Sequence, residues 1–172
     1  VHPLPTTEIG GTGRTQVGAH RARPWVPCWP LRRRCLSRVD HPSPPQQLPI
    51  SARWCLPSQR CIGLEVARTP DQQRMGLMQR PRLPALRGMW FPFDQPRPLS
   101  FWMFNTIAPL DMLFLRGGTV IAIAREVPVC PALPCPSYGP DQSSDGVVEL
   151  AAGEADRLGI RPGDPAKIET IK

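Results

Sequence analysis

From Ile50 onward, the chain consists of short apolar runs that are separated by turn residues. In CIGLEVA, apolar side chains stand at every second position, at Ile62, Leu64 and Val66. A period of two places these side chains on one face of an extended segment and therefore predicts a strand. The same reasoning predicts strands in ISARWCL, CIGLEVA, GMWFPF, LSFWMF, PLDMLFL, TVIAIAREV, GVVEL and AKIETI. About eight short strands at close spacing are typical of an antiparallel β-sandwich or β-barrel.

Helix signals stand out at two places in this region. Thr69, Pro70 and Gln72 form the start pattern of a capping box, which predicts a short helix that ends near Gly76. The segment GEADRLG predicts a second helix, which Gly159 closes. Both helices are too short to build a helical layer. The predicted fold class is therefore all-β, mainly antiparallel, with two short helices.

The first 46 residues differ in composition from the rest of the chain. They hold eight Pro and no apolar period of 2 or 3.6, so they cannot bury enough surface to offset the entropy of ordering. They also hold seven Arg against Glu8 and Asp40, which gives +5 of the net charge of +7 and leaves +2 for the remainder. We predict a disordered segment over residues 1–46, the composition that a translation start placed too early would also give. Residues 47–172 are predicted to form a single β-rich domain.

The same division of charge bears on the class of partner. In the first segment Arg alternates with Trp25 and Trp29, a pairing that suits single-stranded nucleic acid. The predicted domain itself is nearly neutral, so we expect nucleic acid not to be its partner. No apolar run approaches the roughly 18 residues of a membrane span, and no apolar stretch has the length of a signal peptide. We therefore expect no membrane partner and a cytoplasmic location.

All three histidines, His2, His20 and His41, precede the predicted domain. Ser-His-Asp catalysis, Cys-His catalysis and His-ligated zinc each need an imidazole, so the domain excludes them. The segment DQSSDG has the spacing of the first half of a calcium loop, but the twelfth position is Ala152 in place of the bidentate Glu. We expect neither a metal nor another cofactor.

Four cysteines fall in the predicted domain, Cys55 and Cys61 in one pair and Cys130 and Cys135 in another. The spacings C-x5-C and C-x4-C differ from the C-x2-C of zinc knuckles. Cysteines across a hairpin come within bridging distance, whereas thiols stay reduced in the cytoplasm. The spacings therefore favour two local disulfides or free thiols over a metal site.

Five motifs occur in a fixed order along this domain: VARTPDQQRMGLMQR, GMWFPF, FWMFNTIAPLDMLF, VPVC...CPSYGP and VVELAAGEADRLGIRPGD. Together they resemble the uncharacterised bacterial and archaeal family known as domain of unknown function 192. The resemblance covers about residues 47 to 170. It implies a compact β-rich domain of unassigned activity, and it implies no reaction.

The run FWMFNTIAPLDMLF places polar residues inside an apolar segment. If PLDMLFL is a strand that is buried on both faces, the carboxyl group of Asp111 needs a partner. Arg74 or Arg80 would supply it through a two-pronged guanidinium contact. Asn105 and Thr106 precede a bend, where their side chains can bind backbone groups. One interpretation is therefore an internal polar network that fixes the strand register.

The other interpretation is that this network opens to a cleft. Aromatic walls beside Arg, Asn and Asp suit sugars or other small polar ligands. The candidate ligand-binding residues are then Arg74, Trp102, Asn105, Asp111 and Tyr138. We predict a small, soluble, monomeric binding or accessory module for a small polar ligand, and the sequence identifies no protein partner. The alternative is an enzyme without histidine that uses a carboxylate such as Asp111 or a thiol such as Cys130.

Overall fold

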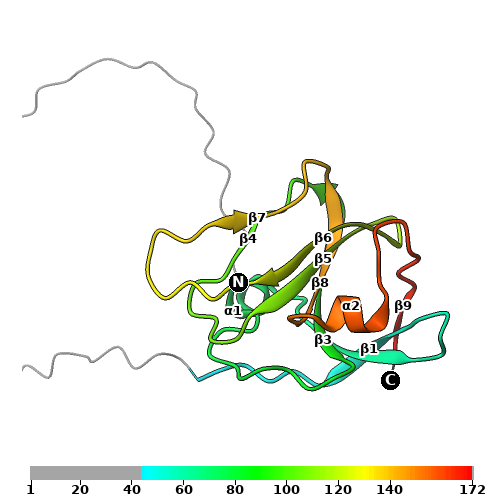
Figure 1. Ribbon diagram of the computed structural model, residues 1–172, viewed down its shortest axis with the longest axis horizontal. Coiled ribbons are helices and arrows are strands. Elements are labelled where there is room, and N and C mark those ends of the chain that lie inside the picture. Colours follow the sequence, from blue (N-terminus) through cyan, green and yellow to red (C-terminus); the bar gives the residue numbers. More distant parts are fainter. Residues whose placement is uncertain (1–43, 172) are drawn as a thin grey trace, which may run out of the picture. The chain divides into compact units, whose positions relative to one another are not determined.

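The computed structural model describes residues 44–171, and these form the β-rich domain (Figure 1). Most of the segment that was predicted to be disordered, residues 1–43, lies outside the described residues. The described part contains nine strands and two helices. Their bounds are β1 Ile50–Cys55, β2 Cys61–Val66, α1 Pro70–Met75, β3 Arg87–Arg97, β4 Phe101–Trp102, β5 Leu110–Arg116, β6 Thr119–Val127, β7 Ser137–Tyr138, β8 Ser144–Ala151, α2 Glu154–Leu158 and β9 Ile168–Thr170.

Seven of the strands form one open sheet in the order β6-β5-β8-β3-β2-β1-β9, and β4 pairs with β7 in a second, small sheet. Neighbouring strands run antiparallel except for β2 and β3, which are parallel. Parallel neighbours need a crossover connection, and the segment that contains α1 provides it. The prediction of an all-β, mainly antiparallel sandwich or barrel with two short helices is confirmed, and because the large sheet is not closed the fold is sandwich-like.

The large sheet carries a hydrophobic core on each face. Successive residues of a strand point to opposite faces, so Met112 and Phe114 of β5 enter one core while Leu113 and Leu115 enter the other. Core A, on the first face, also contains Ala67, Leu77, Leu83, Met89, Phe91, Leu99, Phe101, Met103, Leu110, Val127, Val147 and Ala151. Core B, on the second face, also contains Ala52, Trp54, Leu56, Ile62, Leu64, Val66, Val120, Val148, Leu150, Ala155, Leu158, Ile160 and Ala166.

Different elements cover the two cores. Ala155 and Leu158 of α2 pack into core B, and Phe101 of β4 packs into core A. The Phe101 ring stands edge-on to Phe91 of β3 and Phe114 of β5, at centroid distances of 5.4 and 6.2 Å. Edge-to-face aromatic pairs stabilise a core beyond their buried area. The small sheet is therefore held against the large one through aromatic contacts.

The main departures from the predicted elements lie in the proline-rich stretch. LSFWMF gives only the two-residue strand β4, and β7 lies between β6 and β8, where the sequence predicted no strand. Proline lacks the N–H that a strand ladder needs, which keeps both strands short. Between residues 44 and 171 there is no helix with the length and apolar character to cross a membrane.

Candidate functional site

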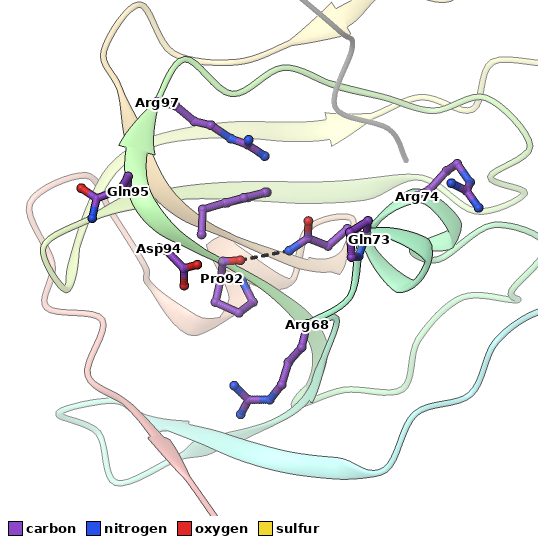
Figure 2. Close-up of a pocket in the computed structure, with 9 residues that line it drawn as sticks. Arg68, Gln73, Arg74, Pro92, Asp94, Gln95 and Arg97 are labelled. Atoms are coloured by element: carbon purple, nitrogen blue, oxygen red, sulfur yellow. Dashed lines mark hydrogen bonds between the residues drawn. The ribbon is translucent and has the colours of Figure 1, made fainter.

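A basic pocket of about 830 Å³ opens between α1 and β3 (Figure 2). Its walls come from the residues just before and within α1 and from the second half of β3. Figure 2 shows Arg68, Arg74 and Arg97 on three sides of it, around Pro92. The lining residues are Arg68, Pro70, Gln73, Arg74, Pro92, Phe93, Asp94, Gln95 and Arg97.

Local hydrogen bonds fix the two walls of the basic pocket. The Thr69 hydroxyl accepts from the Gln72 backbone N–H, and the Gln72 side chain accepts in return from the Thr69 N–H, so the predicted capping box is formed. Gln73 follows Gln72 directly. Its side-chain Nε2 donates to the carbonyls of Ala67 at 3.3 Å and Pro92 at 3.0 Å. The second of these bonds ties α1 to β3 across the pocket (Figure 2).

The basic pocket carries an excess of positive charge. Arg74 pairs with Asp71 of its own helix. Arg97 lies over the Phe93 ring, 4.4 Å from the ring centroid, and neither Arg97 nor Arg68 forms an ion pair within residues 44–171. Asp94 brings one carboxylate to the same lining. Two guanidinium groups are thus left to interact with solvent or with a ligand.

Asp111 is fully buried in β5, as the sequence predicted for this residue, but its partners are not guanidinium groups. Its Oδ1 accepts from the Glu126 backbone N–H at 2.8 Å, and its Oδ2 accepts from the Ala155 N–H at 2.9 Å. The prediction of an ion pair with Arg74 or Arg80 is therefore wrong. Arg74 pairs with Asp71, and Arg80 donates to both oxygens of Glu65 at 2.8 and 2.7 Å.

The other predicted site residues lie in different surroundings. Asn105 is exposed at a left-handed φ of 58°, which Asn tolerates better than most residues, and its turn is closed by the backbone bond from Thr106 N to the Met103 carbonyl. Trp102 is half-buried on β4 and lies 5.6 Å from the Phe104 ring. Tyr138 of β7 lines a separate apolar pocket of about 210 Å³. Of the five candidates, Arg74 lines the basic pocket.

The structure joins Cys55 to Cys61 and Cys130 to Cys135 as disulfides. The first closes the hairpin between β1 and β2, and the second closes a loop that leads into β7. Within residues 44–171, no three His, Cys, Asp or Glu side chains are grouped to hold a metal ion. With Cys130 in a disulfide and both oxygens of Asp111 bound to backbone, neither residue of the alternative enzyme hypothesis presents a free reactive group.

Sequence reasoning missed Arg68, Gln73 and Arg97 as pocket residues. Arg68 lies between a strand and a helix cap, and Arg97 stands in the polar QPRP stretch, where charged residues normally face solvent. The meeting of these residues depends on the parallel pairing of β2 with β3 around α1. No periodicity in a single sequence reveals that pairing.

Comparisons with known proteins agree with this fold. The family model DUF192, described as an uncharacterized ACR, matches residues 55–168. A comparison with curated proteins found no match. A solved structure from Sinorhizobium meliloti 1021, named as a "putative transcription regulator", is 34% identical with a TM-score of 0.60, over 69% of this chain and 91% of that one.

A second solved structure, a protein of unknown function from Novosphingobium aromaticivorans DSM 12444, is 32% identical with a TM-score of 0.62. The similarity covers 75% of this chain and 89% of that one. The family match spans well over half of the 172 residues, and both solved structures are similar to this chain in sequence and in overall fold. The chain therefore belongs to the DUF192 family of uncharacterised proteins.

Proposed function

We propose that this domain is a binding module whose basic pocket takes a small anionic ligand that carries phosphate or carboxylate groups. The observation behind the proposal is that Arg68, Arg74 and Arg97 all line one pocket, on three of its sides. The proposal narrows the expected small polar ligand to a negatively charged one. It moves the expected site from Asp111 and its neighbours to the surface between α1 and β3.

Charge distribution supports an anion as the ligand. Residues 47–172 hold fourteen basic against twelve acidic side chains, so the domain as a whole attracts anions weakly. The basic pocket concentrates three guanidinium groups, of which Arg68 and Arg97 are without a carboxylate partner among the described residues. Guanidinium presents paired N–H donors that match the oxygens of a phosphate or a carboxylate.

The size and the apolar part of the lining narrow the ligand class further. About 830 Å³ lies within the range of pockets that hold metabolite-sized molecules. Pro70, Pro92 and the half-buried Phe93 supply apolar surface beside the charges. A ligand with an anionic group and a carbon skeleton, such as a sugar phosphate or a tricarboxylate, uses both kinds of lining.

Isothermal titration calorimetry on the full chain tests the proposal, with pyrophosphate, citrate and ribose 5-phosphate as probes and glucose as the uncharged control. We expect binding of at least one anion that weakens as salt is added. Arg68→Ala and Arg97→Ala should each weaken it about tenfold or more, because a hydrogen bond to a charged group contributes roughly 1.5–3 kcal/mol. Arg116→Ala is the matched control, because Arg116 is exposed at the end of β5 and does not line the pocket.

Two outcomes would contradict the proposal. The first is the absence of heat with every anion, and the second is equal weakening by Arg116→Ala and by the pocket variants. The name of the Sinorhizobium protein suggests one further probe, a short DNA duplex. Binding of the duplex together with no binding of the small anions would also overturn the assignment of a small ligand.

A further inference from the structure

A further pocket, of about 300 Å³, lies at the turn between β5 and β6 and shares no lining residue with the basic pocket. We call it the turn pocket. The residues used in the argument are Trp90, Gly118, Asp145, Gly146 and Lys167, which all line it. They come from β3, the β5–β6 turn, β8 and the segment before β9.

Backbone contacts fix the walls of the turn pocket. On one side, Gly117 N donates to Asp145 Oδ2 at 2.7 Å. On the other side, Ala166 N donates to the Gly118 carbonyl at 2.7 Å. The turn therefore holds the segments of Asp145 and Lys167 on its two flanks.

Trp90 presents a hydrogen-bond donor at this pocket. Gly146 has no side chain, and a Cβ placed there would lie 3.1 Å from Trp90 Nε1, so the indole edge occupies that space. Trp54 donates its indole N–H to the Pro165 carbonyl at 3.2 Å, whereas the half-buried Trp90 indole N–H has no acceptor among residues 44–171. The Trp90 Nε1 atom is not among the fully buried polar atoms, so this N–H is accessible from the pocket and can donate to an acceptor that a ligand supplies.

The turn pocket also holds one charge of each sign. Asp145 Oδ2 is engaged by the turn, which leaves Oδ1 without a hydrogen-bond donor in the described part of the chain. Neither Asp145 nor Lys167 forms an ion pair with the other or with any residue between 44 and 171. Opposite charges that line one small pocket without pairing are suited to a ligand that carries both charges.

From these contacts we infer that the turn pocket binds a small zwitterion of the amino-acid class. The ligand ammonium group binds Asp145, and its carboxylate binds the Lys167 ammonium group and the Trp90 indole N–H. These contacts are charge-assisted at both ends of the ligand, which selects against molecules with only one charge. The inference is independent of the anion proposed for the basic pocket.

NMR titration of the ¹⁵N-labelled full chain with glycine and L-alanine tests the inference. We expect saturable shifts of the Trp90 indole N–H and of the Gly117 and Gly118 amides, with a Kd on the order of 1 mM. Acetate and methylammonium, each with one of the two charges, should bind at least tenfold more weakly. The indole N–H signal that is missing from the spectrum of Trp90→Phe is the signal of Trp90.

Three variants identify the contacts. Asp145→Asn keeps an oxygen for the Gly117 N–H, and Lys167→Met keeps most of an exposed aliphatic stem, so both should fold. Each should raise the Kd for glycine about tenfold or more, as should Trp90→Phe. Asp141→Asn and Arg116→Gln are the matched controls. Arg68→Ala tests whether glycine binds in the basic pocket instead, because Arg68 lines that pocket and not the turn pocket. All three variants should leave glycine binding unchanged.

The inference is overturned if about 50 mM glycine causes no shift, a concentration far above the expected Kd. It is also overturned if acetate alone reproduces the response, or if Lys167→Met and Asp145→Asn bind glycine as the wild type does. Lys167 is exposed, so its substitution keeps the test valid even if a change at Asp145 disturbs the turn.

Discussion

Glu149 is a carboxyl group held inside core A. It stands on β8 opposite Met89 of β3 and Met112 of β5, both of which belong to that core. The side chain is fully buried, and neither of its oxygens has a hydrogen-bond partner among residues 44–171. Burial disfavours the charged form and raises the pKa of Glu149 to about 8. The folded protein therefore keeps this group protonated at neutral pH.

This shift predicts how stability depends on pH. The unfolded pKa is about 4.5, so between about pH 4.5 and 8 the folded state holds a proton that the unfolded state has released. The contribution of Glu149 to stability is complete below this window and is lost as the pH rises through it, by up to roughly 1.4 kcal/mol per pH unit. Glu149→Gln should remove that slope and raise the free energy of unfolding at pH 8.

Urea unfolding at pH 5, 7 and 9 measures this effect. Glu126→Gln is a suitable control because the Glu126 side chain is exposed. A wild-type slope that persists in Glu149→Gln would assign the pH dependence to another group.

The side chain of Asp111 connects three secondary-structure elements by hydrogen bonds. Helix α2 begins after Gly153, which has no side chain to cap the first turn. Asp111 of β5 supplies the missing acceptor, since its Oδ2 receives the Ala155 N–H while its Oδ1 receives the Glu126 N–H of β6. One side chain thus joins a central strand, an edge strand and the helix that covers core B.

Loss of this acceptor should therefore weaken three elements together. Asp111→Ala leaves the N–H groups of Glu126 and Ala155 without a partner, which should cost roughly 2–6 kcal/mol at about 1–3 kcal/mol for each buried donor. Asp111→Asn keeps one acceptor oxygen and should cost about half as much. Denaturant unfolding gives the total, and amide hydrogen exchange should show faster exchange at Ala155 and Glu126.

Asp156→Ala is the control, because Asp156 lies exposed on the same helix. If Asp111→Ala and Asp156→Ala cost the same, the capping role of Asp111 is wrong.

At the scale of the whole molecule, the parts of the fold that a single sequence predicts are those set by local pattern. The strand periods, the capping box at Thr69 and the buried position of Asp111 follow from spacing alone. The partner of Asp111 does not follow from spacing, because a guanidinium group and two backbone N–H groups satisfy a carboxyl group equally well. Choosing between them requires the strand order, which places β5 between β6 and β8.

The candidate sites depend on the same long-range information. Arg68 and Arg97 are separated along the chain and meet because β3 returns parallel to β2 after the crossover that contains α1. Trp90, Asp145 and Lys167 meet because β8 pairs with β3 and because Ala166 is bonded to the β5–β6 turn. Arg68 and Lys167 lie outside the strands, and Arg97 is the last residue of β3, so the apolar periods of the sequence contain no sign of either meeting.

The two disulfides lead to a prediction for the whole domain. Each closes a short loop, over sequence separations of 6 and 5 residues, and cross-links of this length restrict the unfolded chain by about 2 kcal/mol each. The second also anchors the loop that leads into β7, whose partner β4 carries Phe101 into core A. The double substitution Cys130→Ser with Cys135→Ser should therefore lower Tm by roughly 5–10 °C.

Alkylation of the native full chain, followed by mass spectrometry, tests whether these cross-links exist in the protein as it is made. We expect Cys55, Cys61, Cys130 and Cys135 to resist iodoacetamide until a reductant is added. Persistent disulfides belong to oxidising compartments, so this result would also argue against the cytoplasmic location expected from the sequence. Free modification of all four thiols in the native protein would leave that expectation standing, and the stability loss predicted for the serine variants should then disappear.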